Sequence, residues 1–229
     1  MFVERENTIF TKLKLKKMKL LLTSLISIIF SFNYSISDQN NSIDFKKEIQ
    51  DWQDTMNFEF KNPEESPLTK EGMDLFKSLD FFSIDIKYRV EAKFERTPFE
   101  PIFGMKTTTS RLPKYKKYGV AIFFIDGKEF KLNVYQNQSL LAKRDFEDYL
   151  FIPYTDLTSG NDSYSGGKYI DLKDPKGDLL IIDFNKSYNP YCAYNHKYSC
   201  PVPPKENFLN TRIEAGVKAY NDLANKSHK

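Results

Sequence analysis

The chain has 229 residues, of which 40% are hydrophobic and 28% are charged, and its formal net charge is +3. Residues 1–37 carry six Lys or Arg and two Asp or Glu, which leaves a net charge of −1 for residues 38–229. That balance implies no basic surface of the kind on which nucleic-acid binding depends, so no nucleic-acid partner is expected. The 20 Phe and 14 Tyr, beside only 9 Gly, are typical of a mainly β domain.

The first 37 residues are built like a secretory signal peptide. Lysines between Lys12 and Lys19 precede an apolar run over residues 20–32, and Ser35 and Ser37 place small side chains at a cleavage site. The run is short for a membrane span, which needs about 20 apolar residues. We therefore expect an exported protein, periplasmic or secreted, with no stable membrane span once the signal is removed. A retained N-terminal anchor is the alternative, and Met18 is an alternative start.

Two helices are predicted ahead of the β region. Ser42 is a suitable N-cap for a helix over residues 42–61, and Asn62-Pro63 ends it. Ser66-Pro67 opens a second short helix with Pro at its first position. We expect residues 38–80 to form a helical segment that packs on a β domain over residues 81–229.

Alternating apolar residues predict the strands of that β domain. Strands are expected over residues 88–94, 105–111, 118–125, 129–135, 179–184 and 211–215. Asp126-Gly127 predicts a tight hairpin turn between the third and fourth of these. Residues 139–149 have an apolar side at helical spacing and predict an inserted helix, and a frayed helix is expected at the C-terminus. The prediction is a single β-barrel or sandwich-like domain of about seven strands, with two N-terminal helices and one inserted helix.

Both cysteines lie in the segment NPYCAYNHKYSCPVPPKEN, residues 189–207, which follows neither helical nor strand periodicity. In an exported chain a Cys192–Cys200 disulfide is the ordinary outcome. A metal site on Cys192, His196 and Cys200 is a second interpretation, and a reactive Cys192 thiol with His196 as base is a third. We predict the disulfide, no metal and no cofactor.

Several segments of the chain resemble the family called domain of unknown function 1684. They are LDFFSIDIKYRVEAKFERTP, YGVAIFFIDGKEFKLNVYQNQ, LFIPYTDLTSG, SYSGGKYIDL, DFNKSYNPYCAY and SCPVPPKENFL, and together they cover roughly residues 66–220. The resemblance implies a single mostly β domain in an exported protein, and it implies no activity. Its shared pattern falls on Asp156, Gly167, Tyr169, Asp171, Asn185, Asn189, Cys192, Cys200, Pro203 and Asn207. Lys168 stands where the family often has arginine, which puts bidentate anion binding there in doubt.

Polar residues at strand ends and in loops suggest a binding site for a small polar ligand. The predicted ligand-binding residues are Asp156, Lys168, Tyr169, Asp171, Asn185, Asn189 and Tyr191. Tyr169 and Asp171 are two apart in a predicted strand and should share a face. Tyr188, Tyr191, Tyr194 and Tyr198 form a stacking platform or simply pack. Asn185 and Asn189 either bind the ligand or tie down the cysteine loop by hydrogen bonds to backbone, and Asn207 is expected to tie down that loop as well.

The leading hypothesis is thus an exported small-ligand-binding β domain. A hydrolase or thiol-dependent enzyme using the same loops is one alternative, and a structural envelope protein is another. The sequence names neither the ligand nor an oligomeric state.

Overall fold

A computed structural model describes residues 43–220 of the chain. The chain divides into two compact units, residues 1–47 and residues 48–229, and the description below concerns the second unit. The expected signal peptide and the expected C-terminal helix fall largely on residues outside the described range. Within residues 43–220, no helix combines the length and the apolar character needed to cross a bilayer.

The helical segment follows the prediction closely at its start and less closely after residue 62. The first helix covers residues 43–61. The second, α2 (Lys70–Leu75), begins later than predicted because Thr69, not Ser66, is its N-cap: the Thr69 side chain accepts a hydrogen bond from the Gly72 N–H. Four 3-10 turns follow in the chain, namely η1 (Ile86–Tyr88), η2 (Phe184–Lys186), η3 (Tyr191–Ala193) and η4 (Lys205–Asn207).

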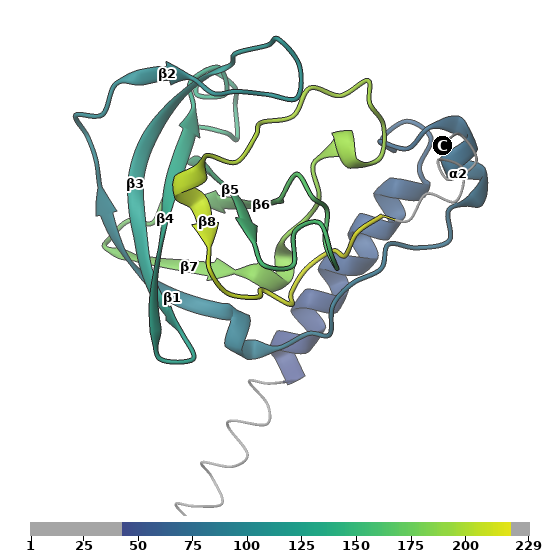
Figure 1. The fold of residues 1–229 in the computed structure, drawn as a ribbon, viewed down its shortest axis with the longest axis horizontal. Coiled ribbons are helices and arrows are strands. Elements are labelled where there is room, and N and C mark those ends of the chain that lie inside the picture. The colour runs from purple at the N-terminus through teal and green to yellow at the C-terminus, as the bar shows by residue number, and fades with distance from the viewer. Residues whose placement is uncertain (1–42, 221–229) are drawn as a thin grey trace, which may run out of the picture. The chain divides into compact units, whose positions relative to one another are not determined.

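One curled sheet of eight strands forms the body of the fold (Figure 1). Its strands are β1 (Arg89–Arg96), β2 (Ile102–Gly104), β3 (Lys114–Ile125), β4 (Lys128–Asn137), β5 (Tyr149–Asp156), β6 (Lys168–Lys173), β7 (Leu179–Asp183) and β8 (Phe208–Leu209). The order is β6-β5-β4-β3-β1-β7, with β2 added to β3 and β8 added to β5. All pairings are antiparallel except that of β5 with β8.

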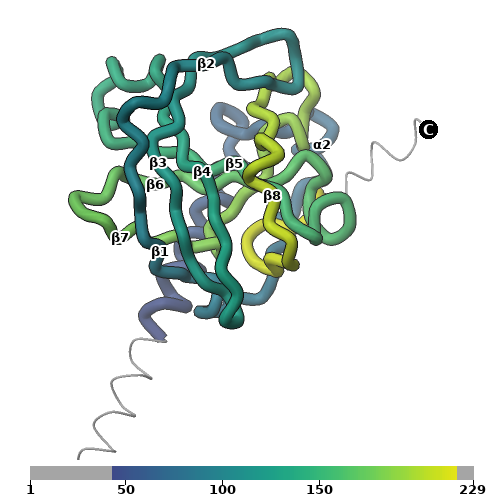
Figure 2. The backbone as a smooth tube through the Cα atoms, turned by 60° about the vertical axis from the view of Figure 1, so that its left-hand side comes forward, coloured from purple at the N-terminus to yellow at the C-terminus, as the bar shows by residue number. Residues whose placement is uncertain are grey.

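The sheet is an open half-barrel, so the prediction of a barrel or sandwich was right in its β class and wrong in its closure. β6 and β7 end the sheet on opposite sides and share no ladder within the described residues. Instead the chain leaves β7 through η2, and Tyr188 then exchanges two backbone hydrogen bonds with Tyr169 of β6. The tube in Figure 2 shows β1, β3 and β4 side by side on the curved wall. The gap between β6 and β7 is thus bridged at one point by the segment that carries the cysteines.

The concave face of the sheet holds the main hydrophobic core. Phe94, Phe123, Leu132, Ile152 and Ile182, from five different strands, are all buried in it. The apolar run LLII of β7 is typical of a strand covered on both faces, but Leu179 and Ile181 are 54% and 39% exposed. As an edge strand of an open sheet, β7 buries only one face, so residues 179–182 alternate in burial although all four are apolar.

The hairpin of β3 and β4 confirms the strongest local prediction. Ten residue pairs join the two strands, and Asp126 and Gly127 both have positive φ angles, of 50° and 75°. A two-residue turn of this kind has the twist of the flanking strands, which is why Asp-Gly favours it.

The inserted helix predicted over residues 139–149 is absent. The segment is a succession of tight turns, in which Leu140 N–H donates to Asn137, Lys143 N–H to Leu140 and Phe146 N–H to Lys143. Asp145 has a positive φ of 71°, which a continuous helix does not tolerate. Apolar spacing alone therefore gave the wrong structure, and the segment ends where β5 begins.

Two predicted strands are also absent. In residues 105–111 the Thr107 hydroxyl donates to the Arg111 carbonyl, and this side-chain bonding replaces a strand ladder. Residues 211–215 form no strand because the carbonyls of Ile213 and Ala215 accept hydrogen bonds from the Lys168 ammonium instead. β8 lies a few residues earlier than that prediction.

Candidate functional site

A pocket of about 420 Å³ opens between the helix over residues 43–61, strand β6 and the chain segment over residues 188–201. The volume is in the range of sites that hold small organic molecules. Its walls are made by Trp52, Met56, Glu59, Tyr169, Asp171, Tyr188, Pro190, Tyr191, Tyr198, Ser199, Cys200 and Pro201.

The helix contributes one continuous face to this pocket. Trp52, Met56 and Glu59 are spaced four and three residues apart, which aligns them along one side of a helix. All three are partly exposed, and the Trp52 ring meets Phe81 edge to face, with ring centroids 6.1 Å apart. The spacing was visible in the sequence, but it is equally typical of a face that packs on a core, so these residues were missed.

Tyrosine rings form the opposite wall. Tyr169 and Tyr188 meet edge to face with centroids 5.8 Å apart, and Tyr191 and Tyr198 do the same at 5.2 Å. The Tyr169 ring also packs on Phe151, and its hydroxyl donates to the Pro201 carbonyl, so this side chain is anchored at both ends. Three of the four tyrosines proposed as a platform thus line the pocket. The fourth, Tyr194, is buried against Phe60.

Asp171 is an exposed acidic residue beside the tyrosine wall. Its carboxylate accepts hydrogen bonds from the hydroxyls of Tyr149, at 2.6 Å, and Tyr188, at 2.8 Å and 2.9 Å. Desolvation of the carboxylate by the surrounding side chains raises the pKa of Asp171 above its ordinary value, and the two hydrogen bonds oppose that shift. Burial, with the Asp171 charge, also raises the pKa of Tyr188 and of Tyr149, so both hydroxyls stay protonated and serve as donors.

The two cysteines are adjacent but not bonded to each other. Both are free thiols, and the Cys192 N–H donates to the Cys200 sulfur at 3.2 Å. A hydrogen bond from Cys200 lowers the pKa of Cys192 to about 6 against the effect of burial, and further bonds from Tyr164 and Thr108 assist. The same bond to Cys192, together with burial, raises the pKa of Cys200. The pKa of Cys192 is thus the lower of the two, and Cys200 borders the pocket.

The metal interpretation of this segment finds no geometric support. Within the described residues, no group of three or more His, Cys, Asp or Glu side chains is gathered closely enough to hold a metal ion. His196 is exposed, whereas both cysteines are buried.

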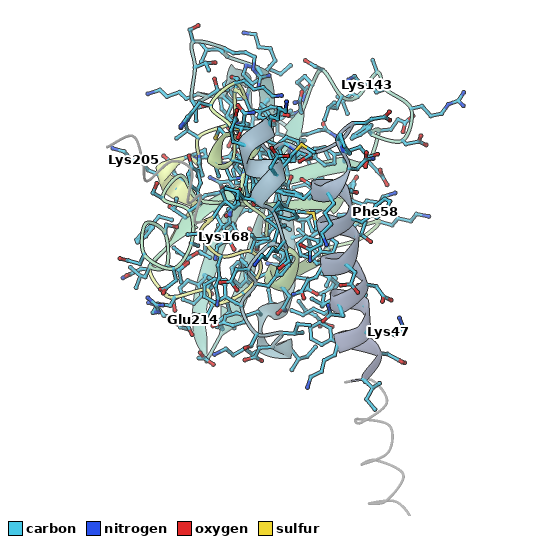
Figure 3. The ribbon with its side chains drawn as sticks, turned by 90° about the vertical axis from the view of Figure 1, so that its right-hand side faces the viewer. Lys47, Phe58, Lys143, Lys168, Lys205 and Glu214 are labelled. Atoms are coloured by element: carbon cyan, nitrogen blue, oxygen red, sulfur yellow. The ribbon has the colours of Figure 1, made fainter. Side chains whose placement is uncertain are left out.

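Asp156 and Lys168 lie together, away from the pocket walls. The Lys168 ammonium is 3.1 Å from the Asp156 carboxylate, and both side chains are completely buried. Lys168 also donates to the Ile213 carbonyl at 2.9 Å, while Asp156 accepts from the Thr158 N–H at 2.7 Å. Burial lowers the pKa of Lys168, and the attraction of Asp156 opposes that shift. Figure 3 shows Lys168 inside the fold, with Lys143 and Lys205 at its periphery.

The two predicted asparagines are also occupied by internal hydrogen bonds. The Asn185 amide pairs with both backbone groups of Asp85, at 3.1 Å and 3.0 Å. Asn189 donates to the Lys218 carbonyl at 2.8 Å and to the Tyr194 hydroxyl at 3.3 Å. Asn189 ties down the cysteine segment, which is the structural role weighed for it from the sequence, whereas the Asn185 amide holds η2 against Asp85 instead.

Of the seven predicted ligand-binding residues, the structure therefore gathers three at one pocket: Tyr169, Asp171 and Tyr191. Tyr169 and Asp171 share a face of β6, as their spacing predicted. Whether any of the seven binds a ligand stays a prediction.

A family model described as a protein of unknown function (DUF1684) matches residues 74–218. The chain belongs to this family. Tyr169, Asp171 and Cys200 of this DUF1684 domain line the pocket, whereas Asp156, Asn185, Asn189 and Asn207 are buried polar residues. These seven residues are thus divided between the pocket and the hydrogen bonds that hold the fold.

The solution NMR structure of an uncharacterized protein from Haloarcula marismortui is similar to this DUF1684 domain. The two are 32% identical, with a TM-score of 0.62, over 80% of this chain and 98% of the other. No functionally curated protein matches the chain significantly.

Proposed function

We propose that this DUF1684 domain binds a small polar ligand in the pocket between Trp52 and the tyrosine wall. The observation that carries the proposal is the combination of a 420 Å³ pocket, aromatic walls and a carboxylate with a raised pKa inside it. Apolar walls with a few convergent polar groups are what small-molecule sites share. A titratable group with a shifted pKa in such a cleft strengthens the case.

Trp52 makes this proposal easy to test, because it is the single Trp of the chain and it lines the pocket. We expect at least one of three probes, choline, glucose or inorganic phosphate, to change the Trp52 fluorescence saturably. The change should be lost in Tyr191→Ala, since Tyr191 is a partly exposed wall residue whose removal leaves the core intact. Phe124→Ala, which removes an exposed ring from β3, is the matched control and should keep the response. Identical responses in both variants would contradict binding at this pocket.

The proposal includes export of the protein and closure of the Cys192–Cys200 pair in an oxidising compartment. The 3.2 Å contact between the two residues and the lowered pKa of Cys192 support closure, because the thiolate is the form that attacks in disulfide chemistry. On the chain-entropy model, closing so short a loop should raise the free energy of unfolding by about 2.5 kcal/mol.

Mass spectrometry after alkylation, with and without reductant, measures this closure. Protein taken from the periplasm is expected to take up two alkyl groups only after reduction, and its melting temperature should fall on reduction. Cys192→Ser should melt at the same temperature with and without reductant. Two alkylated thiols without reductant would contradict the disulfide.

A further inference from the structure

We infer that the ligand of the pocket is an organic ammonium ion, held on the aromatic walls and paired with Asp171 and Glu59. This inference rests on the proposed function and specifies the class of ligand. It begins from the charge of the walls: two of the lining residues are acidic, and none is Lys, Arg or His. An anion would lose its hydration beside two carboxylates and gain no cation in return.

Unlike several other carboxylates of the domain, the two in the pocket have no protein cation within residues 43–220. Elsewhere, Glu48 contacts Arg89 and Lys186 at 2.6 Å each, and Asp174 contacts Arg96 at 2.8 Å. Within residues 43–220, by contrast, no Lys, Arg or His side chain pairs with Glu59 or with Asp171. Asp171 receives only tyrosine hydroxyls, so its charge is solvated but not balanced. A cationic ligand would balance the negative charges of Glu59 and Asp171.

Two basic residues, Arg111 and Lys197, contact residues of the pocket wall but do not pair with either carboxylate. Arg111 directs its guanidinium at Ser199, donating to the carbonyl at 2.6 Å and to the hydroxyl at 3.1 Å. Lys197 is exposed, and its ammonium lies over the Tyr198 ring, 5.0 Å from the centroid. That contact shows that a tyrosine of this wall accepts an ammonium group on its ring.

The walls suit an organic cation better than a bare metal ion. Trp52 and four tyrosines offer aromatic surface, and aromatic cages are the usual means of holding alkylated ammonium groups. A metal ion would require several oxygen, nitrogen or sulfur ligands close together, and the described residues provide no such group. The volume of 420 Å³ leaves room for a ligand of several heavy atoms.

Choline and its neutral carbon isostere, in which carbon replaces the ammonium nitrogen, provide the test, because they differ in charge and hardly in shape. Dissociation constants are obtained from Trp52 fluorescence with the full chain. We expect the dissociation constant of choline to be lower than that of the isostere by a factor of at least about ten. Asp171→Asn and Glu59→Gln should each weaken choline binding about tenfold and leave the isostere unchanged. Glu147→Gln, an exposed acid outside the pocket, should change neither constant.

The outcomes separate the inference from the proposed function. If the isostere, glucose or phosphate binds as tightly as choline, the ammonium inference is overturned while the pocket remains a binding site. If no probe of any charge affects Trp52, the proposed function fails, and the inference with it. Glu59→Gln lies on a partly exposed helix face, so it keeps the test decisive even where Asp171→Asn fails to fold.

Discussion

Replacing Lys168 with Met is expected to lower the free energy of unfolding by about 3–5 kcal/mol. The ammonium lies 3.1 Å from Asp156 with neither side chain exposed, so its loss leaves an ionised carboxylate without a partner in a dry interior. The carbonyls of Ile213 and Ala215 would also lose their donor. Chemical denaturation, monitored by circular dichroism, measures the change, and the melting temperature should fall by roughly 10 °C.

Lys143→Met is the matched control for this prediction. Lys143 lies at the periphery in Figure 3 and is exposed, so the same substitution there should change the free energy of unfolding by less than about 0.5 kcal/mol. The double variant Lys168→Met/Asp156→Asn should recover part of the loss, because it removes the uncompensated charge while Asn still accepts from the backbone. Equal stability of Lys168→Met and the control would contradict a buried ion pair and would favour a surface role for Lys168.

Replacing Asn207 with Ala is expected to cost about 3 kcal/mol of stability. The side chain is fully buried and accepts from the Asn133 N–H at 2.8 Å. It also donates to the carbonyls of Asn133, at 2.9 Å, and Pro153, at 2.8 Å, and so joins β4 and β5 where these two neighbouring strands have only one ladder pair. Each backbone group left unpaired in the interior costs about 1–3 kcal/mol.

Two further variants sharpen this second prediction. Asn207→Asp keeps the acceptor and loses both donors, so it should be destabilised as well. Glu206→Ala alters the exposed neighbour and should leave the denaturation midpoint almost unchanged. If Asn207→Ala unfolds at the same denaturant concentration as Glu206→Ala, the amide does not hold the two strands together.

The parts of the fold that could be predicted are those whose residues act locally. Asp126-Gly127 fixes the hairpin of β3 and β4 because few other dipeptides adopt two positive φ angles at low cost. Residues 139–149 show the opposite case. Their apolar spacing suits a helix, yet turn bonds from Asn137 onward and the positive φ of Asp145 decide the structure.

The sequence does not predict that the sheet is open, because sheet closure depends on how distant strands are placed. A strand such as LLIID in β7 reads the same whether one face or both are covered, and only the positions of the other strands decide which.

Some residues of the candidate site could likewise be predicted from local pattern, and others could not. Tyr169 and Asp171 were placed on one face by the period of a strand, and both line the pocket. Asn185 was grouped with them because it ends a strand, where polar residues serve either binding or structural hydrogen bonds. Its bonds to the backbone of Asp85 give it the structural role. Trp52, Met56 and Glu59 come from a helix more than a hundred residues away from β6 in the chain, so no local pattern links them to the tyrosines.

An NMR titration of nitrogen-labelled protein with choline tests the central claim, a ligand site at this pocket, most directly. The indole N–H of Trp52 needs no assignment, because the chain has a single Trp. We predict a saturable shift of that signal together with the backbone amides of Asp171 and Tyr191, and no shift at Asn185 or Asn207. A titration that leaves the Trp52 indole unmoved, or that shifts Asn185 and Asn207 instead, would contradict it.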